Sequence, residues 1–412
     1  MSRTAVVGAG IIGLACAHAL RRRGEDVLLL DAGEPGGACS SGNAGWIVPS
    51  FSTPLPAPGL TIAMLLRMLR HDGPLAIAPA ALPSLAPWLW QFRRYCNPSD
   101  FERGTRALAA LARGTQSLLR ALADDGISFE RHDAGVLFAY RRDADMRQGA
   151  RDFALLRECG LAMPGTLSGD EARALEPALS DQVIGGYLVA EDCHVRPESL
   201  TAALADRVAA LGVEVRRGVR VLGGGRTDGG IALETSAGAM KADRMLIAAG
   251  AWSAALAAIF GGKLPVQGGK GYSVTVQSPP WRVRRAVYLA EAHVACSPFA
   301  GAMRFAGTME LAGMDSRVDQ RRLDAVCRSA EPYLRETLPW RSGSSWAGLR
   351  PLTPDGLPLI GWLPGHDRVY VATGHAMLGM TLAPATAELI ARLIVDGESG
   401  PDLAPFDPAR FA

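Results

Sequence analysis

TAVVGAGIIG, residues Thr4–Gly13, starts as an apolar strand and ends in a turn with glycine at positions 8, 10 and 13. The chain continues as IIGLACAHALRRRG, with apolar residues at helical spacing, and then as EDVLLLD, a second apolar run that ends at Asp31. A strand, a glycine turn, a helix and a strand in this order form a βαβ unit, whose two strands are parallel and buried. We therefore expect the first 31 residues to open a Rossmann-like α/β domain.

The three glycines of this turn have different tasks in a dinucleotide-binding unit. Gly8 allows a tight turn, Gly10 lets the backbone approach a pyrophosphate, and Gly13 lets the helix pack closely on the strand. The phosphates then lie at a helix N-terminus, where free N–H groups and the helix dipole favour negative charge. Asp31 is placed to accept hydrogen bonds from ribose hydroxyls, and it disfavours a 2′-phosphate. The pattern predicts a dinucleotide site, and alone it does not separate NAD from FAD.

Composition and charge indicate a globular protein without a nucleic-acid partner. The chain has 412 residues, of which 48% are hydrophobic and 20% charged, and this length suits two domains. The 43 basic and 41 acidic residues leave a net charge of +2. A protein that neutralises a phosphate backbone needs a much larger excess of positive charge.

The cysteines and the apolar runs indicate in which cellular compartment the protein is expected. The seven cysteines are scattered without a C-x-x-C pair, which favours a reducing compartment over a disulfide framework, and we expect no metal site. A transmembrane helix needs about 18 or more apolar residues, and the apolar stretch LAIAPAALPSLAPWLW is interrupted by prolines. We expect a cytoplasmic protein, and we leave open a peripheral contact with the inner face of the membrane.

Later segments indicate a second domain inserted into the first. FERGTRALAALARGTQSLLRALADDG has leucines at the spacing of one helix face, and strands separated by turn residues follow from Val213. The glycine cluster in LGGGRTDGG indicates a hairpin turn. We expect an α/β and α+β protein in which a discontinuous cofactor domain supports a substrate domain with a mixed or antiparallel sheet. The cofactor domain would comprise residues 1–50, 191–262 and 345–412, and the substrate domain residues 51–190 and 263–344.

Two further glycine-bearing segments favour a flavin over a nicotinamide. SSGNAG, residues Ser40–Gly45, has small residues that let backbone N–H groups approach phosphate and ring oxygens. TGHAMLG, at residues 373–379, precedes an amphipathic helix whose positive end can face the pyrimidine side of a flavin. A tightly held flavin collects contacts from distant segments of this kind.

The order of these motifs resembles the FAD-dependent D-amino-acid dehydrogenase family, within the wider group of D-amino-acid, glycine and sarcosine oxidases. The resemblance rests on VVGAGIIGLACAHALRRRGEDVLLLDAG, SSGNAG, KGYSVT, WAGLRPLTPDGLPLIG and GHAMLGMTLAPATAELIARLI. It spans both ends of the chain and is loose from Phe51 to about Gly185. It implies non-covalent FAD, because sarcosine-oxidase-like members attach flavin through a C-terminal cysteine and the last cysteine here is Cys327.

The resemblance also implies the residues of the site. Arg350, in the GLRP turn, would bind the substrate carboxylate through a bidentate guanidinium. Tyr272 and His375 are candidates to line the substrate cavity; the alternatives are a core strand tyrosine and a turn histidine with its own hydrogen-bond partners. Arg304 either reaches the same cavity or pairs with a neighbour. The expected cofactor-binding residues are Gly8, Ala9, Gly10, Ile11, Ile12, Gly13, Asp31, Ser40, Ser41, Asn43, Ala44, Gly45, Val219, Gly250, Trp252, Gly374, His375, Leu378, Gly379 and Thr381.

The implied reaction is oxidative deamination of a D-amino acid, by hydride transfer from Cα to flavin N5. The imino product hydrolyses to a 2-oxo acid, and the electrons pass to a quinone-like carrier or to O2. A cyclic imino acid, D-proline or hydroxy-D-proline, stays open as the substrate, because similar sequences divide between these substrate classes. Ala376 replaces the family's usual glycine after the histidine, which implies a different roof of the substrate cavity. The alternatives are a glycine- or sarcosine-type oxidase, a non-catalytic FAD-carrying subunit of an electron-transfer complex, and a nicotinamide dehydrogenase.

Overall fold

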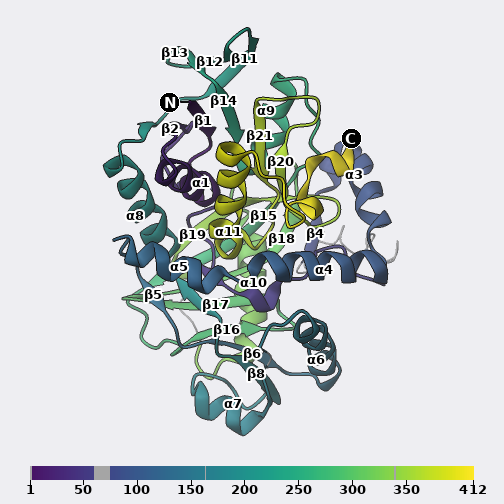
Figure 1. The fold of residues 1–412 in the computed structure, drawn as a ribbon. Helices are drawn as coiled ribbons and strands as arrows, with labels where there is room; N and C mark the ends of the chain where they lie inside the picture. The colour runs from purple at the N-terminus through teal and green to yellow at the C-terminus, as the bar shows by residue number, and fades with distance from the viewer. Residues whose placement is uncertain (1, 60–74, 163, 338–339) are drawn as a thin grey trace.

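In a computed structural model of the chain, the first and last parts of the sequence form one half of the molecule. The structure describes residues 2–59, 75–162, 164–337 and 340–412. Figure 1 shows the N-terminal and C-terminal segments, purple and yellow, side by side around one sheet, with a second sheet below them. The discontinuous cofactor half that the sequence predicts is therefore present.

The first sheet has six strands in the order β10-β2-β1-β14-β21-β20 and is parallel except for its last pair. Ala5, Leu28 and Met245 bury one face of the sheet, and residues one position later in each strand bury the other, as strand alternation requires. The strands are β1 (Arg3–Val7), β2 (Asp26–Leu30), β10 (Glu214–Arg216), β14 (Arg244–Ile247), β20 (Leu359–Trp362) and β21 (Val369–Thr373).

Helices cover one face of this sheet, and a small antiparallel sheet with one helix covers the other. The first face carries α1 (Ile11–Arg22), α8 (Pro197–Ala210) and α11 (Gly379–Ala391), and the second carries β11 (Val221–Thr227), β12 (Gly230–Thr235), β13 (Gly238–Ala242) and α9 (Ser253–Ile259). The expected hairpin turn is present but shorter than predicted. It lies between β11 and β12, while glycines 223–225 belong to β11 itself, where the pairing register shifts.

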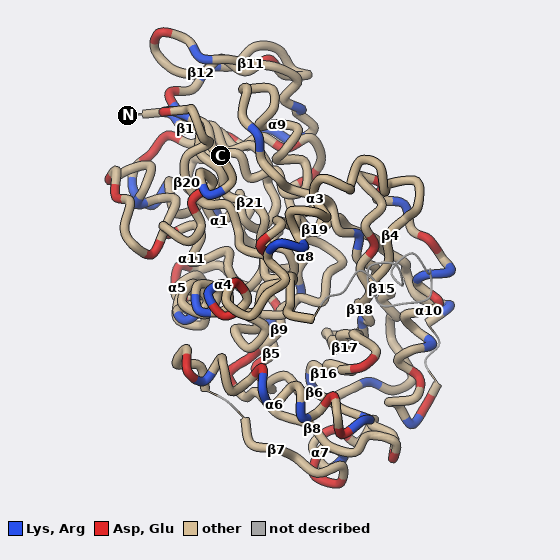
Figure 2. The backbone as a smooth tube through the Cα atoms, turned by 90° about the vertical axis from the view of Figure 1, so that its right-hand side faces the viewer, with Lys and Arg blue, Asp and Glu red and all other residues tan. Residues whose placement is uncertain are grey.

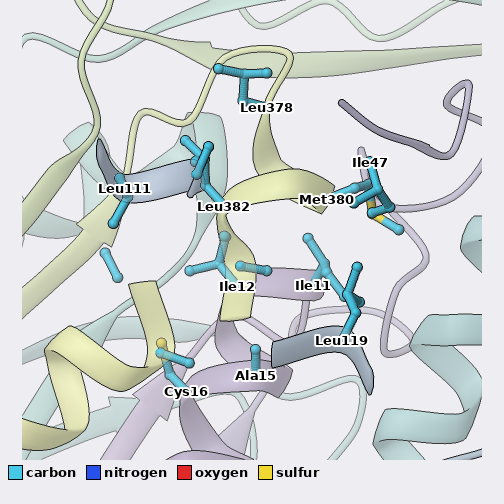
Figure 3. Close-up of a cluster of buried hydrophobic side chains, with 14 of the residues drawn as sticks. Ile11, Ile12, Ala15, Cys16, Ile47, Leu111, Leu119, Leu378, Met380 and Leu382 are labelled. Atoms are coloured by element: carbon cyan, nitrogen blue, oxygen red, sulfur yellow. The ribbon is translucent and has the colours of Figure 1, made fainter. Parts of the chain in front are cut away.

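The leucine-rich stretch after residue 98 forms two helices, not the single helix that its spacing indicates. They are α4 (Pro98–Ala112) and α5 (Thr115–Asp124), separated at Arg113–Gly114. Both pack against α11, and Figure 3 shows Leu111 near Leu382 of α11 and Leu119 near Ile11 of α1. These helices lie in the expected substrate-domain segment yet bury their apolar faces against the cofactor half. The division into domains therefore stays a prediction.

The second sheet is mixed, as the sequence predicts. Its order is β19-β15-β18-β17-β16-β6-β8-β7, with β4 paired to β18; most neighbours are antiparallel, and β16–β6 and β18–β4 are parallel. The strands are β4 (Leu75–Ile77), β6 (Val136–Tyr140), β7 (Thr166–Ser168), β8 (Gly185–Val189), β15 (Gln267–Gln277), β16 (Ala286–Leu289), β17 (Val294–Phe299), β18 (Ala302–Leu311) and β19 (Ser344–Leu352).

Helices also surround this second sheet. Helix α10 packs on the back of β15, β17 and β18, and α3 closes a separate apolar cluster beside β4. The helices of this half are α3 (Leu82–Arg94), α6 (Asp143–Glu158), α7 (Gly169–Leu175) and α10 (Gln320–Ala330). No helix in the four described ranges is long and apolar enough to cross a bilayer. Figure 2 shows basic and acidic residues interspersed along the backbone.

A three-stranded sheet, β3 (Trp46–Ile47), β9 (Cys193–Val195) and β5 (Arg131–His132), ties the loop after β2 to the second half. Just before β9, the carboxyl group of Asp192 is 2% exposed and accepts a hydrogen bond from the Ser50 hydroxyl. Burial raises the pKa of Asp192 from 3.8 to about 7, because a buried carboxylate loses its hydration.

The raised pKa of Asp192 predicts a pH-dependent stability. The folded state holds this proton more tightly than the unfolded state, so the stability that Asp192 contributes falls as pH rises from about 4 to about 7. Asp192→Asn keeps the hydrogen bond without the charge. We expect it to match the wild type at pH 4.5 and to exceed it at pH 8 by about 2–4 kcal/mol. Thermal unfolding at both pH values measures this, with exposed Asp181→Asn as the control; equal effects of the two variants would contradict it.

Candidate active site

A cavity of about 1270 Å³ lies between the two sheets. Pockets for drug-sized ligands measure roughly 300–1,000 Å³, so this one has room for a dinucleotide together with a small substrate. It is lined by the glycine turn of α1, the tip of β2, residues 37–40 and 43–46, the segment after β14, the second sheet, and the turn that precedes α11.

The glycine turn has the close packing that the sequence predicts. Gly8 has φ +109°, and a Cβ there would lie 2.4 Å from the carbonyl oxygen of Ala248. A Cβ at Gly13 would lie 1.8 Å from the carbonyl oxygen of Gly8. The N-terminus of α1 therefore sits directly against β1 with its first N–H groups at the cavity, where they suit a phosphate.

Asp31 lines the cavity and also holds the glycine turn in place. Its Oδ2 accepts a hydrogen bond from the Ala9 N–H at 2.6 Å, and its Oδ1 accepts one from the Gly33 N–H at 2.8 Å. A carboxylate has about four lone-pair sites, so both oxygens can still accept ribose hydroxyls. The predicted ribose contact thus fits the position of the side chain.

The loop Ser40–Gly45 joins the two halves at the cavity wall. The Ser40 hydroxyl accepts a hydrogen bond from the Ile11 N–H at 2.9 Å, at the start of α1. The Asn43 amide donates to the Cys39 carbonyl and accepts from the Gly45 N–H. The Ser41 hydroxyl donates to the Ala38 carbonyl at 3.1 Å, and Ser41 does not line the cavity.

Two glycines of this loop are required by packing against protein. Gly42 has φ +65°, and a Cβ there would lie 2.3 Å from the indole of Trp346. Gly45 has φ +73°, and a Cβ there would lie 1.9 Å from the carbonyl oxygen of Val195. Their N–H groups already donate to the side chains of Glu198 and Asn43. Close packing against other parts of the protein therefore explains why glycine is needed at these two positions. The sequence had suggested a different reason, the approach of a cofactor to the backbone.

Arg304 pairs with its neighbours and does not line the cavity. Its guanidinium donates to the Thr275 hydroxyl, the Asn43 carbonyl and the Glu198 carboxylate, each at 2.8 Å. Glu198 also accepts the Gly42 N–H. Arg304 therefore locks the loop Ser40–Gly45 onto the second sheet, which is the structural role that the sequence left open.

The turn before α11 presents a neutral imidazole to the cavity. His375 is 3% exposed, its Nε2 lies 2.9 Å from the Thr386 hydroxyl, and its Nδ1 has no hydrogen-bond partner among the described residues. Burial lowers the pKa of His375 to about 3, so the ring stays neutral at physiological pH. A buried unpaired nitrogen at a cavity wall costs free energy unless a ligand pairs with it.

Most of the predicted cofactor residues line this cavity. Its walls include Val219, Gly250, Trp252, Leu378 and Gly379 as well as the residues described above. The predicted residues outside the lining are Ala9, Gly13, Ser41, Gly374 and Thr381. Thr381 has a structural contact instead, since its hydroxyl accepts the Val48 N–H at 3.0 Å.

Arg350 lines the cavity from β19 without an acidic partner. Its Nη1 donates to the Thr308 carbonyl at 2.8 Å, and its guanidinium lies over Gly271, where a Cβ would be 2.3 Å from Cζ. No ion pair joins Arg350 to a carboxylate of the described residues, and burial lowers its pKa. A desolvated guanidinium without a counter-charge is suited to an anionic ligand.

Tyr272 borders the cavity, but its side chain packs in the apolar cluster between the second sheet and α10. The hydroxyl donates to Glu310 at 2.5 Å, and Lys270 pairs with the same carboxylate at 3.2 Å. The side chain is fully buried, and this polar cluster raises the pKa of the phenol together with burial. Tyr272 is thus a core residue of the second sheet, and its hydroxyl is not free for a substrate.

Several lining residues escape prediction from the sequence. Thr308 and His293 have positive φ angles of 56° and 51°, and Tyr288 lies beside His293. One local signal could have identified His293: it lies between two strand patterns, at the position of a hairpin. Histidine is enriched in the left-handed conformation that such turns use.

Comparison with known proteins agrees with this site. Residues 3–393 match the family model described as FAD dependent oxidoreductase, DAO. The chain is 30% identical to a D-amino acid dehydrogenase and 32% identical to a D-amino-acid oxidase, both of Bradyrhizobium diazoefficiens, over 99% of its length and 98% of theirs.

A solved structure has the same fold. Glycine oxidase from Geobacillus kaustophilus superposes with a TM-score of 0.76 at 27% identity, over 100% of this chain and 99% of that one. The cavity, the glycine turn and the unpaired polar groups at its walls fit the cofactor of this family. The chain belongs to the DAO family of FAD-dependent oxidoreductases, and its cofactor is FAD.

Proposed function

We propose that this protein oxidises a D-amino acid to the corresponding imino acid, which water then hydrolyses to a 2-oxo acid and ammonia. The observation that carries the proposal is the guanidinium of Arg350, which faces the FAD cavity without an acidic partner. The relatives named D-amino acid dehydrogenase and D-amino-acid oxidase support the D-configuration of the substrate.

Arg350 would bind the substrate carboxylate and orient the Cα–H bond. A guanidinium holds a carboxylate by two parallel hydrogen bonds, which fix angle as well as distance. The Thr308 carbonyl and the bare face of Gly271 fix the guanidinium in turn. FAD supplies the acceptor for the hydride that leaves Cα, and the protein contributes the positioning.

The residues around Arg350 suit a substrate whose amino group is neutral. Besides Arg350, the described charged residues that line the cavity are Asp31, Glu34 and Arg220 at the dinucleotide end. A protonated amine near Arg350 would therefore lack a carboxylate partner. Burial lowers the pKa of His375, so the ring is neutral and adds no positive charge that would repel the one that develops on the substrate nitrogen as the hydride leaves.

The names of the relatives do not agree on the electron acceptor. One is named a dehydrogenase, another an oxidase, and a structural neighbour is a glycine oxidase. A quinone-like carrier is the acceptor that we propose, with O2 as the alternative. A glycine- or sarcosine-type substrate is the second candidate, since the Arg350 site would also hold glycine.

An anaerobic titration of the FAD-loaded protein tests the proposal. The panel comprises D- and L-forms of methionine, alanine and proline, with glycine, sarcosine and hydroxy-D-proline. We expect D-isomers to abolish the absorbance of oxidised flavin and L-isomers to leave it. Reduction by L-isomers alone would reverse the stereochemical assignment, and reduction by glycine or sarcosine alone would favour the second candidate. Admission of air, with and without a soluble quinone, then identifies the acceptor.

A further inference from the structure

Strand β18 contains a bulge at the point where it holds Arg350. The ladder between β15 and β18 shifts its register beside Gly271, so that two residues, Thr308 and Met309, lie opposite this one glycine. An extra residue of this kind bends a strand and changes the direction of its groups. The Thr308 carbonyl in this bulge accepts a hydrogen bond from Arg350 Nη1 at 2.8 Å. The position of the arginine that faces the FAD cavity therefore depends on the bulge.

Thr308 has an unfavourable backbone conformation in this bulge. Its φ is +56°, in the left-handed region where one class of bulge uses glycine and where a β-branched residue is an outlier. A glycine would adopt the same conformation without strain. A strained residue persists only where its surroundings fix it. Contacts of the Thr308 side chain are therefore needed to keep its carbonyl on Arg350.

Helix α10 supplies such a contact from the back of the second sheet. Arg322 Nη2 donates a hydrogen bond to the Thr308 hydroxyl, and Arg322 is 2% exposed and does not line the cavity. The helix packs against β15, β17 and β18, so it holds the guanidinium from a rigid element. A hydrogen bond from a charged donor is roughly twice as strong as a neutral one. Arg322 can therefore offset the strain at Thr308.

A buried charged cluster fixes the end of the bulge from the same side of the sheet. Glu310 is 6% exposed, and its carboxylate accepts the Tyr272 hydroxyl and pairs with Lys270 at 3.2 Å. Tyr272 packs in the same apolar cluster as Leu323 of α10. Neither Glu310 nor Lys270 lines the cavity. The bulge is thus held from behind the cavity wall, by Arg322 at its start and by this cluster at its end.

We propose that Arg322 is a positioning residue for the substrate carboxylate: it holds Thr308 in the left-handed conformation, and the Thr308 carbonyl in turn holds Arg350. This inference rests on the proposed function, because it takes Arg350 as the carboxylate site. Without the hydrogen bond from Arg322, Thr308 relaxes towards an extended conformation, and its carbonyl leaves Arg350 Nη1. A guanidinium without this anchor meets a carboxylate less often in the productive orientation. Arg322 therefore acts on carboxylate binding and not on the flavin.

Substitution of Arg322 tests this role in the FAD-loaded protein. Anaerobic stopped-flow reduction gives the apparent dissociation constant of D-methionine and the limiting rate, and the shift of the flavin spectrum gives the dissociation constant of propanoate, a carboxylate without an amino group. We expect Arg322→Met to raise both dissociation constants about tenfold, the effect of one hydrogen bond to a charged group, with a smaller change in the limiting rate. Arg322→Lys keeps a cationic donor and should recover part of the loss. Arg321→Met, on the exposed side of the same helix, is the matched control and should leave both constants unchanged.

Two substitutions of Thr308 separate backbone strain from packing. Thr308→Val and Thr308→Gly both remove the hydroxyl that Arg322 binds. Valine keeps the β-branched shape and the strain, whereas glycine adopts a φ of +56° freely. We expect Thr308→Gly to bind propanoate about tenfold more tightly than Thr308→Val, because the carbonyl stays on Arg350. A role in packing alone would give the reverse order, since glycine leaves a void and a more flexible chain.

The fold and the cofactor are checked in the same samples by FAD absorbance and the melting temperature. If Arg322→Met retains FAD and binds propanoate and D-methionine as the wild type does, the inference is wrong. If this variant does not fold, the comparison at Thr308 decides: propanoate binding by Thr308→Val that equals or exceeds that by Thr308→Gly would overturn the inference. If no D-amino acid reduces the wild-type flavin, the proposed function fails, while the propanoate affinities still test the role of Arg322.

Discussion

Arg350→Met should give a folded, yellow protein whose flavin D-amino acids reduce very slowly. Methionine keeps the length of the side chain and loses the guanidinium, so the substrate carboxylate would lie desolvated and unpaired. Breaking a buried charge pair costs about 3–5 kcal/mol, which corresponds to a fall in kcat/KM of roughly 10²–10⁴-fold. Anaerobic stopped-flow reduction with D-methionine measures the loss, and the flavin spectrum shows that FAD is retained.

A second substitution separates the position of the guanidinium from its presence. Gly271→Ala would place a methyl group 2.3 Å from the Arg350 Cζ and so displace the side chain without removing its charge. We expect a rise in KM with a smaller loss of kcat, because misplacement weakens the carboxylate contact first. Arg350→Lys should not restore activity, since an ammonium lacks the bidentate fork. Reduction of Arg350→Met at the wild-type rate would mean that another group binds the carboxylate, whereas a non-catalytic FAD-carrying subunit would be reduced by D-methionine in neither form.

The parts of the fold with local signals could be predicted from the sequence. The βαβ unit follows from apolar runs and from glycines at positions 8, 10 and 13. A Cβ at Gly8 or Gly13 would meet neighbouring backbone, and one at Gly10 would meet the Ser40 hydroxyl. The strands of the second sheet follow from alternation. Arg350 emerged from the resemblance of one short motif, and its position at the cavity agrees with the role that the resemblance implies.

The parts that depend on distant contacts could not be predicted. Alternation places Tyr272 on the face opposite Gly271, yet nothing in the sequence tells which face meets the cavity, so the sequence left Tyr272 open as a cavity residue or a core strand residue. The bulge that turns the Thr308 carbonyl towards Arg350 arises from strand pairing between residues about 40 apart. The break between α4 and α5 at Gly114 likewise serves packing against α11.

Gly42→Ala should weaken FAD binding and destabilise the protein, because one methyl group would separate the two halves of the cavity. The new Cβ would lie 2.3 Å from the Trp346 indole, and the same indole already packs against Gly348, so it has little room to move. Overpacking costs about 1–3 kcal/mol, and a left-handed alanine adds roughly 1–2 kcal/mol. We expect a loss of about 3 kcal/mol in unfolding free energy and of about hundredfold in FAD affinity.

Gly301→Ala is the matched control for this prediction. Its φ of +71° is close to the +65° of Gly42, but a Cβ there meets nothing within 4 Å. The control therefore carries the backbone strain without the collision. Denaturant unfolding and quenching of flavin fluorescence compare the two, and Trp346→Leu in the Gly42→Ala background should recover part of the loss in a double-mutant cycle. Equal losses in both alanine variants would mean that backbone conformation alone, and not the contact with Trp346, sets the requirement for glycine in this loop.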